Sequence, residues 1–410
     1  MVTESRGNAT HPFFVRSPNG NLELNQGNRI PFAQPDVGEA EVSAVAEVVR
    51  SGWLTSGAVM RSFEDEFRRY VGIDGHAVAV SSATAGLHLA LEALGVKEGD
   101  EVVVPTWTFT ATAEVVRYLG ATPVFADVDP GSLIATPDTI SAAVTTRTRA
   151  VIIVHFAGCA VDTKAVSERL KGRGIALVED AAHALPTVDV DQLVGECKYS
   201  DATVFSFYAN KTVTTGEGGM LVTRSDDLAK RATVMRLHGI NRDTFDRYTN
   251  GGGGWEYDVV APGYKYNMPD VAAAMGRVQL SRLPQMHQRR VEIAKFYTEV
   301  LTPSRVSLPP AVARPENCAW HLYVMRVNTE KGLDRHRFMG EMGARGIGTS
   351  VHYTPLHHHP YWRQFVGTPA GISLAGAESV ADAAVSIPIS SSLSDEAVEY
   401  IATTARSLLS

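Results

Sequence analysis

Short apolar runs alternate with stretches of helical spacing between residues 76 and 235, and this alternation restricts the fold more than any other feature. Strands separated by helices of roughly ten or more residues indicate a mostly parallel sheet with helices on both faces. The continuous apolar character of AVIIV and of ALV suits strands that are buried on both sides. The expected strands lie at 76–80, 101–105, 123–128, 150–158, 175–180, 202–207 and 218–224. The sequence therefore predicts an α/β fold.

Helical spacing also marks segments outside this region. Segments 39–52 and 62–72 each end at a glycine, which is a common helix stop. Residues 268–301 predict one long helix, interrupted or kinked near Pro284, and the remaining residues predict a small α+β unit. A run of glycines after Asn250 predicts a mobile loop. We therefore expect a polar N-terminal arm at 1–29, a large domain at 30–283 and a small C-terminal domain at 284–410.

The composition argues against several classes of protein. The formal net charge is -7, and no cluster of Lys and Arg offers a surface for nucleic acid. No run approaches the roughly 18 apolar residues of a spanning helix, and the N-terminus lacks the apolar core of a signal peptide. Cys159, Cys197 and Cys318 lie far apart in the sequence, which favours a reducing compartment over a disulfide scaffold. We expect a cytoplasmic protein without nucleic-acid or membrane partners.

Polar groups follow the ends of three expected strands, where open α/β sheets usually bind their ligands. The segment SSATAG joins a strand to a helix, and its small residues and free N–H groups would suit a phosphate. An alternative is an ordinary helix cap made by Ser82 or Thr84. Asp180 ends an apolar strand, and Lys211 follows another. These positions predict a binding site at one edge of the sheet.

Asp180 and Lys211 each allow two interpretations. A carboxylate at the end of a buried strand needs a cationic or hydrogen-bonding partner, such as a protonated pyridine nitrogen, although it could also be a structural cap. A lysine at the same edge is a candidate Schiff-base amine, although most lysines lie on the solvated surface. The glycine-rich segment TTGEGGM after Lys211 favours a tight, enclosed environment.

A metal site is not expected. Three adjacent histidines, His357 to His359, might suggest one, but adjacent histidines rarely converge on a single ion. No Cys/His spacing elsewhere supports a zinc site. We interpret the HHHP segment as a loop.

Seven motifs, in this order along the chain, resemble one known family. The resemblance is to the nucleotide-sugar aminotransferases of the DegT/DnrJ/EryC1/StrS family, and it extends from about Ile30 to the C-terminus. It implies the pyridoxal-phosphate-dependent fold type I, with a large domain around a mostly parallel sheet and a small α+β domain. The motifs are SGWLTSG, SSATAGLHLAL, EVVVPTWTFTATA, LGATPVFADVD, VEDAAHA, FSFYANKTVTTGEGGM and GYKYNMPDVAAAMG.

The resemblance also implies roles for individual residues. It implies pyridoxal 5'-phosphate as cofactor, held by Lys211 as a Schiff base, with Asp180 at the pyridine nitrogen. It places His183 near the ring hydroxyl and Phe109 against the ring face. It assigns the phosphate to Ala83, Thr84 and Ser206, and to Asn267 from the partner subunit of a homodimer with shared active sites. Thr55 and His352 fall in segments expected near the substrate. Taken alone, Phe109 would be a core aromatic, Ser206 a strand-end cap, and His183 and Asn267 turn residues.

The implied reaction passes an amino group from a donor, expected to be glutamate, to a keto-sugar nucleotide. The segments SSATAG, GYKYN and GIGTSVHY are most similar to the branch that aminates C4 of a UDP-4-keto-pentose. Two alternatives stay open: an aminotransferase for a cyclitol or another cyclic ketone, and a non-catalytic regulator that binds the cofactor. The family's sugar dehydratases replace the lysine with histidine, whereas this chain has Lys211.

Overall fold

The computed structural model describes residues 14–16, 22–24, 28–241, 257–302, 304, 306–309, 314–327, 333–366 and 371–409. The predicted glycine loop after Asn250 and most of the predicted arm at 1–29 lie outside these ranges.

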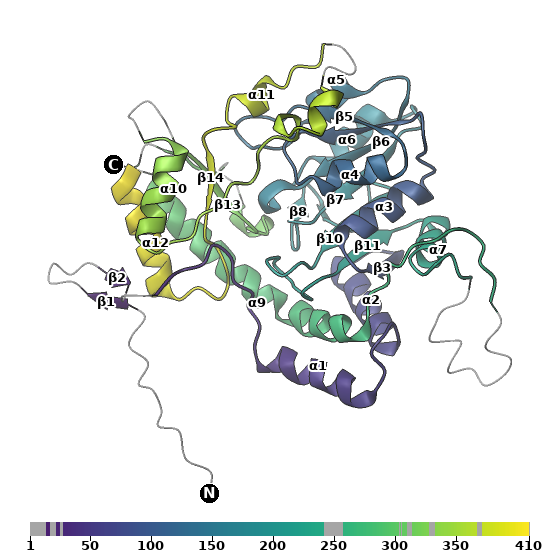
Figure 1. Cartoon of the computed structure of the whole chain (residues 1–410), viewed down its shortest axis with the longest axis horizontal. Helices are drawn as coiled ribbons and strands as arrows, with labels where there is room; N and C mark the ends of the chain where they lie inside the picture. The colour runs from purple at the N-terminus through teal and green to yellow at the C-terminus, as the bar shows by residue number, and fades with distance from the viewer. Residues whose placement is uncertain are drawn as a thin grey trace, which may run out of the picture.

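A seven-stranded sheet occupies the centre of the larger part of the molecule (Figure 1), in the order β3-β11-β10-β7-β6-β4-β5. The neighbours from β10 to β5 pair in parallel, whereas β11 runs antiparallel to both β10 and β3. The mostly parallel sheet predicted from the alternation is therefore confirmed. Its strands are β3 (His76–Val80), β4 (Glu101–Pro105), β5 (Thr122–Ala126), β6 (Thr148–Val154), β7 (Ala176–Asp180), β10 (Ala202–Ser206) and β11 (Gly219–Thr223). A two-stranded ribbon, β8 (Val188–Asp189) and β9 (Gln192–Leu193), lies between β7 and β10 in the chain.

Helices cover both faces of this sheet. Successive strand residues point to opposite faces, so Val102 and Val104 belong to one apolar cluster and Val103 to another. Helices α3, α4 and α7 pack against the first face, and α2, α5, α6 and α9 against the second. Gly52 and Gly72 end the first two helices with φ of 77° and 72°. The helices are α1 (Glu39–Ser51), α2 (Ala58–Val71), α3 (Ala83–Ala93), α4 (Ala111–Tyr118), α5 (Pro137–Ala143), α6 (Thr163–Leu170), α7 (Asp226–Met235) and α9 (Asp270–Leu301).

Helix α9 connects the large sheet with a smaller unit and contacts α1, α2 and α12 (Figure 1). The helix is continuous through Pro284, so the predicted interruption there does not occur; packing against these helices holds it together. The boundary proposed near Leu283 falls within this helix. Among the described residues, no helix combines the length and apolar character that crossing a membrane requires. The smaller unit contains β12 (Val306–Ser307), β13 (Tyr323–Val327), β14 (Ala384–Ile387), α10 (Arg335–Ala344) and α12 (Asp395–Leu409). Helix α11 (Ala375–Glu378) packs instead at the end of β5, where Asp127 accepts from the Gly376 and Ala377 N–H groups.

Part of the predicted N-terminal arm forms regular secondary structure. Strands β1 (Phe14–Arg16) and β2 (Leu22–Leu24) form an antiparallel pair, and Leu24 packs against the core of the smaller unit. Four short 3-10 turns complete the described structure: η1 (Phe156–Gly158), η2 (Pro315–Asn317), η4 (Leu356–His358) and η5 (Trp362–Phe365).

Candidate active site

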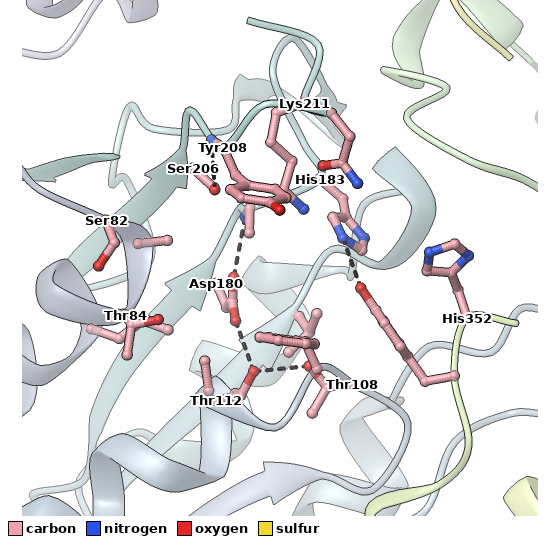
Figure 2. Close-up of a pocket in the computed structure, with 18 of the residues that line it drawn as sticks. Ser82, Thr84, Thr108, Thr112, Asp180, His183, Ser206, Tyr208, Lys211 and His352 are labelled. Carbon is pink, nitrogen blue, oxygen red and sulfur yellow. Dashed lines mark hydrogen bonds between the residues drawn. The ribbon is translucent and has the colours of Figure 1, made fainter. Parts of the chain in front are cut away.

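A cavity of about 470 Å³ opens at the carboxyl ends of the parallel strands, between the large sheet and residues 352–353 (Figure 2). This inner cavity collects most of the residues predicted from the sequence, which come from separate strand ends and helix starts. The sheet topology brings them together because parallel strands end at the same edge. The predicted residues in its lining are Ala83, Thr84, Phe109, Asp180, His183, Ser206, Lys211 and His352.

Lys211 lies in the turn after β10, where its backbone N–H donates to the Tyr208 carbonyl over 2.9 Å. Its side chain points into the inner cavity, as Asp180 does (Figure 2). Burial lowers the pKa of Lys211 to about 8, and the nearby Asp180 carboxylate only partly opposes this. About a tenth of the amine is therefore uncharged at pH 7, and the uncharged form is the one that a nucleophile or proton acceptor needs.

Asp180 ends β7 and is held at the floor of the cavity by two donors. The Thr112 hydroxyl donates to Oδ2 over 2.8 Å, and the Ala182 N–H donates to Oδ1 over 3.1 Å. Burial raises the pKa of Asp180, and these hydrogen bonds and the charge of Lys211 counteract it. The hydrogen bonds and Lys211 therefore do not fully offset the effect of burial on the charged carboxylate. A cationic group placed against it would stabilise its charge.

Glu179 immediately precedes Asp180 and is fully buried on the opposite face of the strand. Its Oε2 lies 2.8 Å from His155 Nε2, and Thr203 donates to Oε1 over 2.7 Å. The Ser200 hydroxyl donates to the same oxygen. These contacts hold the pKa of Glu179 below its usual value despite its burial. Glu179 therefore has its own set of partners and anchors the end of β7.

The start of α3 forms the opposite end of the cavity. Ser82 Oγ caps the helix by accepting from the Ala85 N–H over 3.1 Å, so the alternative reading of SSATAG as a cap is correct for Ser82. Ala83 and Thr84 occupy the first helical positions, whose N–H groups have no partner within the helix. Ser206 Oγ accepts from the Tyr208 N–H over 3.3 Å, which leaves its proton for a ligand. This arrangement of donors suits an anion.

His183 and Tyr353 form a hydrogen-bonded pair at the rim. The Ala157 N–H donates to His183 Nδ1 over 3.3 Å, and the Tyr353 hydroxyl lies 3.2 Å from His183 Nε2. Burial lowers the pKa of His183 well below its usual value, so the ring is neutral. Because Nδ1 accepts, the ring proton belongs on Nε2 and is donated to Tyr353. The hydroxyl proton of Tyr353 can then be donated to a ligand.

A second, outer cavity of about 1020 Å³ adjoins the first. Thr108, Phe109, His352 and Tyr353 line both cavities and form their common wall. Phe109 is 58% exposed, so the alternative reading of it as a core aromatic is wrong. Burial lowers the pKa of His352 to about 4, so this imidazole is uncharged near neutral pH. The outer lining also includes Tyr118, Tyr361 and Trp362.

Thr55 and Asn267 stand apart from the described lining of both cavities. Asn267 contacts the residue that follows Thr55, because Ser56 Oγ accepts from Asn267 Nδ2 over 2.6 Å. The Lys265 amine donates to the Asn267 side-chain oxygen, so amide and ammonium donors are adjacent there.

Sequence reasoning missed several residues of the inner cavity. Thr112 comes from helix α4, and nothing in the local sequence connects it with Asp180, which is 68 positions away. Tyr353 lies beside His352 in the motif GIGTSVHY, so that motif did carry a usable signal. The other described lining residues that were not predicted include Thr108, Tyr208, Asn210 and Glu217.

The HHHP segment forms the short turn η4. His357 and His358 direct their Nε2 atoms to Glu378 Oε1 over 2.7 and 3.0 Å, and these three side chains could hold a metal ion. The contacts have the lengths of hydrogen bonds. Glu378 is remote in the sequence, so the spacing of the histidines did not indicate this cluster. The absence of a metal remains a prediction.

Comparison with known proteins identifies the family. The model of the DegT/DnrJ/EryC1/StrS aminotransferase family matches residues 35–406. The chain belongs to this family. The spore coat polysaccharide biosynthesis protein SpsC of Bacillus subtilis (strain 168) is 41% identical over 382 residues, which cover 93% of this chain and 97% of SpsC. The predicted family and fold class are confirmed.

Two solved structures of aminotransferases have the same fold. The aminotransferase TlmJ from Streptoalloteichus hindustanus has a TM-score of 0.84 and 36% identity, covering 93% of this chain and 98% of TlmJ. Helicobacter pylori PseC, an aminotransferase involved in the biosynthesis of pseudoaminic acid, has a TM-score of 0.85 and 26% identity, covering 93% of this chain and 99% of PseC. This chain is accordingly a pyridoxal-phosphate-dependent sugar aminotransferase.

The inner cavity fits pyridoxal 5'-phosphate. The first turn of α3 and Ser206 offer donors for its phosphate, and Asp180 is a buried carboxylate for its ring nitrogen. Lys211 provides a buried amine with a lowered pKa for its aldehyde. In addition, the side-chain oxygen of Asn210, which lines the same cavity, is buried without a hydrogen-bond partner among the described residues.

Proposed function

We propose that this enzyme transfers the amino group of glutamate to C4 of a 4-keto-sugar nucleotide, in a homodimer with shared active sites. The single observation that carries the proposal is the pair of adjoining cavities with a common wall. The inner cavity suits the cofactor, and the outer one, at about 1020 Å³, is large enough for a sugar together with its nucleotide. A bare cyclitol would leave most of the outer cavity empty.

The bound cofactor carries the amino group between the two substrates and withdraws electrons from the carbon that exchanges a proton. Lys211 holds the cofactor and, once released from it, moves that proton through its Nζ atom. A pKa of about 8 suits this role near neutral pH. Asp180, held by Thr112 and the Ala182 N–H, keeps a negative charge against the ring nitrogen.

The remaining residues of the inner cavity bind and orient. Ala83, Thr84 and Ser206 would hold the phosphate, Phe109 would contact the ring, and His183 would approach the ring hydroxyl. His352, uncharged and in the common wall, contacts the sugar. The Tyr353 hydroxyl donates toward the same region, since its oxygen already accepts from His183.

Thr55 and Asn267 act in the active site of the partner subunit. Three observations support this: both residues stand apart from the described lining of their own cavities, Asn267 contacts Ser56 next to Thr55, and Lys265 lies beside Asn267. An amide and an ammonium donor together suit the dianionic phosphate of the cofactor.

The test is glutamate-dependent amination of a panel of keto-sugar nucleotides, with the free keto sugars and cyclic ketones such as keto-cyclitols as comparison substrates. We expect glutamate to bleach the cofactor absorbance and a 4-keto-sugar nucleotide to restore it, with the amine at C4. Lys211→Ala is the inactive control. Faster turnover of a bare cyclic ketone would establish the cyclitol alternative. A cofactor band that no amino donor bleaches would indicate a non-catalytic regulator.

A further inference from the structure

Two cysteines that are far apart in the sequence meet in the structure. The Sγ atoms of Cys159 and Cys318 lie 3.3 Å apart, although 159 positions separate the two residues. Both are thiols in this structure. The aminotransferase reaction uses neither of them. Cys197, the remaining cysteine, is buried elsewhere, with its Sγ 3.3 Å from Thr203 Oγ1.

The pair lies between two segments that pack against each other. Cys159 follows the turn η1 and Cys318 follows η2, which leads into β13. Backbone hydrogen bonds join the segments: the Ala319 N–H donates to the Gly158 carbonyl over 3.1 Å, and the Leu322 N–H donates to the Ala157 carbonyl over 3.3 Å. These backbone hydrogen bonds fix the two segments next to each other, and this brings the two sulfur atoms close together.

The two thiols differ in accessibility. Cys318 is 1% exposed, whereas Cys159 is partly exposed and lines a crevice of about 20 Å³ beside Trp320. That volume accommodates a molecule on the order of the size of water. Burial, reinforced by the neighbouring Cys159, raises the pKa of Cys318 well above its usual value. A small oxidant therefore meets Cys159 first.

We propose that Cys159 and Cys318 form an oxidation site, at which hydrogen peroxide converts the two thiols reversibly into a disulfide. Cys159 Sγ attacks the peroxide; an S–O bond forms, the O–O bond breaks, and hydroxide leaves with the thiol proton as water. Cys318 Sγ then displaces the oxygen; the S–S bond forms, the S–O bond breaks, and a second water carries away the Cys318 proton. The sulfur atoms lose two electrons, which the peroxide accepts.

Forming the bond needs a small movement. A disulfide has an S–S length of about 2.05 Å, so the sulfur atoms must approach by roughly 1.3 Å. The new bond would close a loop of 159 positions and join the turn that contacts His183 to the segment that enters the small sheet. A cross-link across so long a loop should raise the stability of the folded enzyme.

The test uses the holoenzyme, fully reduced and then treated with increasing hydrogen peroxide. Remaining thiols are alkylated after denaturation, and the protein is digested without reduction for mass spectrometry. We expect one peptide pair that joins Cys159 to Cys318, and alkylation at Cys197 alone. Dithiothreitol should restore all three alkylated cysteines. Oxidation of Cys159 to sulfinic acid without a cross-link, or full alkylation of the pair at peroxide levels that oxidise the partly exposed Met275 and Met339, would overturn the proposal.

Matched variants show whether the cross-link requires Cys159 and Cys318 or forms with any cysteine of the chain. Cys197→Ser should keep the cross-link, whereas Cys159→Ser and Cys318→Ala should both lose it. The apparent melting temperature should rise on oxidation and fall again with dithiothreitol in wild type and in Cys197→Ser, but not in Cys159→Ser. An equal rise in Cys159→Ser would contradict the assignment, even if Cys318→Ala did not fold.

Discussion

The hydroxyl of Thr112 donates a 2.8 Å hydrogen bond to Oδ2 of Asp180, and the Thr108 hydroxyl lies 2.8 Å from that of Thr112. Helix α4 thereby positions the carboxylate at the end of β7. The family resemblance identified Asp180 but not the group that holds it.

Thr112→Val should slow amino transfer. The substitution keeps the shape but removes a hydrogen bond to a charged group, which contributes about 1.5 kcal/mol or more, or about tenfold in rate. Single-turnover bleaching of the cofactor by glutamate measures this step. Asp180→Asn should be slower still, because it removes the charge itself. Thr108→Val keeps the contact with Asp180 and is the control; an equal loss in both threonine variants would show that Asp180 is not the target.

The stability of the apoenzyme should depend on Lys211 in alkaline solution. Its pKa falls from 10.5 to about 8 on folding, a shift of about 2.5 units or roughly 3 kcal/mol. Well below pH 8 both states carry the proton and the penalty of burying the charge is complete. Between about pH 8 and 10.5 the folded state loses the proton first, so the free energy of unfolding rises with pH.

Lys211→Met isolates this contribution. The variant apoenzyme should be more stable than wild type at pH 7, and the difference should shrink as the pH rises from 8 to 10.5. Urea unfolding of both proteins at several pH values measures it. A difference that stays constant across this window would mean that Lys211 titrates normally.

Tyr353→Phe should impair the enzyme through its hydroxyl alone. We expect about a tenfold loss in kcat/KM for the keto-sugar acceptor, from the loss of one hydrogen bond and of the partner of His183. Stopped-flow measurement of the two half-reactions locates the defect. Tyr199→Phe, which removes a tyrosine hydroxyl outside the described lining of both cavities, is the matched control. A wild-type rate in both half-reactions would remove Tyr353 from the site.

Two inactive variants should complement each other if the active site is shared. Lys211→Ala loses the amine, and Asn267→Asp places a carboxylate against the partner's phosphate. In a mixed dimer, one site collects both defects and the other receives wild-type Lys211 and wild-type Asn267 from different chains. Activity should therefore reappear after subunit exchange. An inactive mixture that contains mixed dimers by native mass spectrometry would assign both residues to one chain.

Chelation should leave turnover unchanged. The contacts of His357 and His358 with Glu378 are explained by hydrogen bonds, and His357 Nδ1 also lies 2.6 Å from the Thr106 hydroxyl. Activity after exhaustive dialysis against EDTA, with elemental analysis, is the measurement. A loss that zinc restores in wild type but not in His358→Ala would reveal a metal site.

The mostly parallel sheet could be predicted because the alternation of strands and helices is regular along the sequence. Asp180 and Ser206 end β7 and β10, and Lys211 follows β10, so parallel strands bring all three residues to one edge of the sheet. Relationships between distant segments could not be predicted in this way. The pairs Thr112–Asp180 and Cys159–Cys318 depend on how loops and helices pack, which no local pattern encodes. The continuity of α9 through Pro284 likewise follows from its packing neighbours rather than from its sequence.

The two adjacent carboxylates at the end of β7 make the enzyme sensitive to strand register. Glu179 and Asp180 serve opposite faces of the sheet, with different partners on each side. Sliding β7 by one position would reverse the faces: in one direction Glu179 would take the place of Asp180 in the catalytic cavity, and in the other direction Asp180 would face His155. Either slip would break hydrogen bonds that now hold these two carboxylates. The hydrogen bonds of Glu179 and Asp180 therefore favour the correct pairing of β7 with its neighbours during folding.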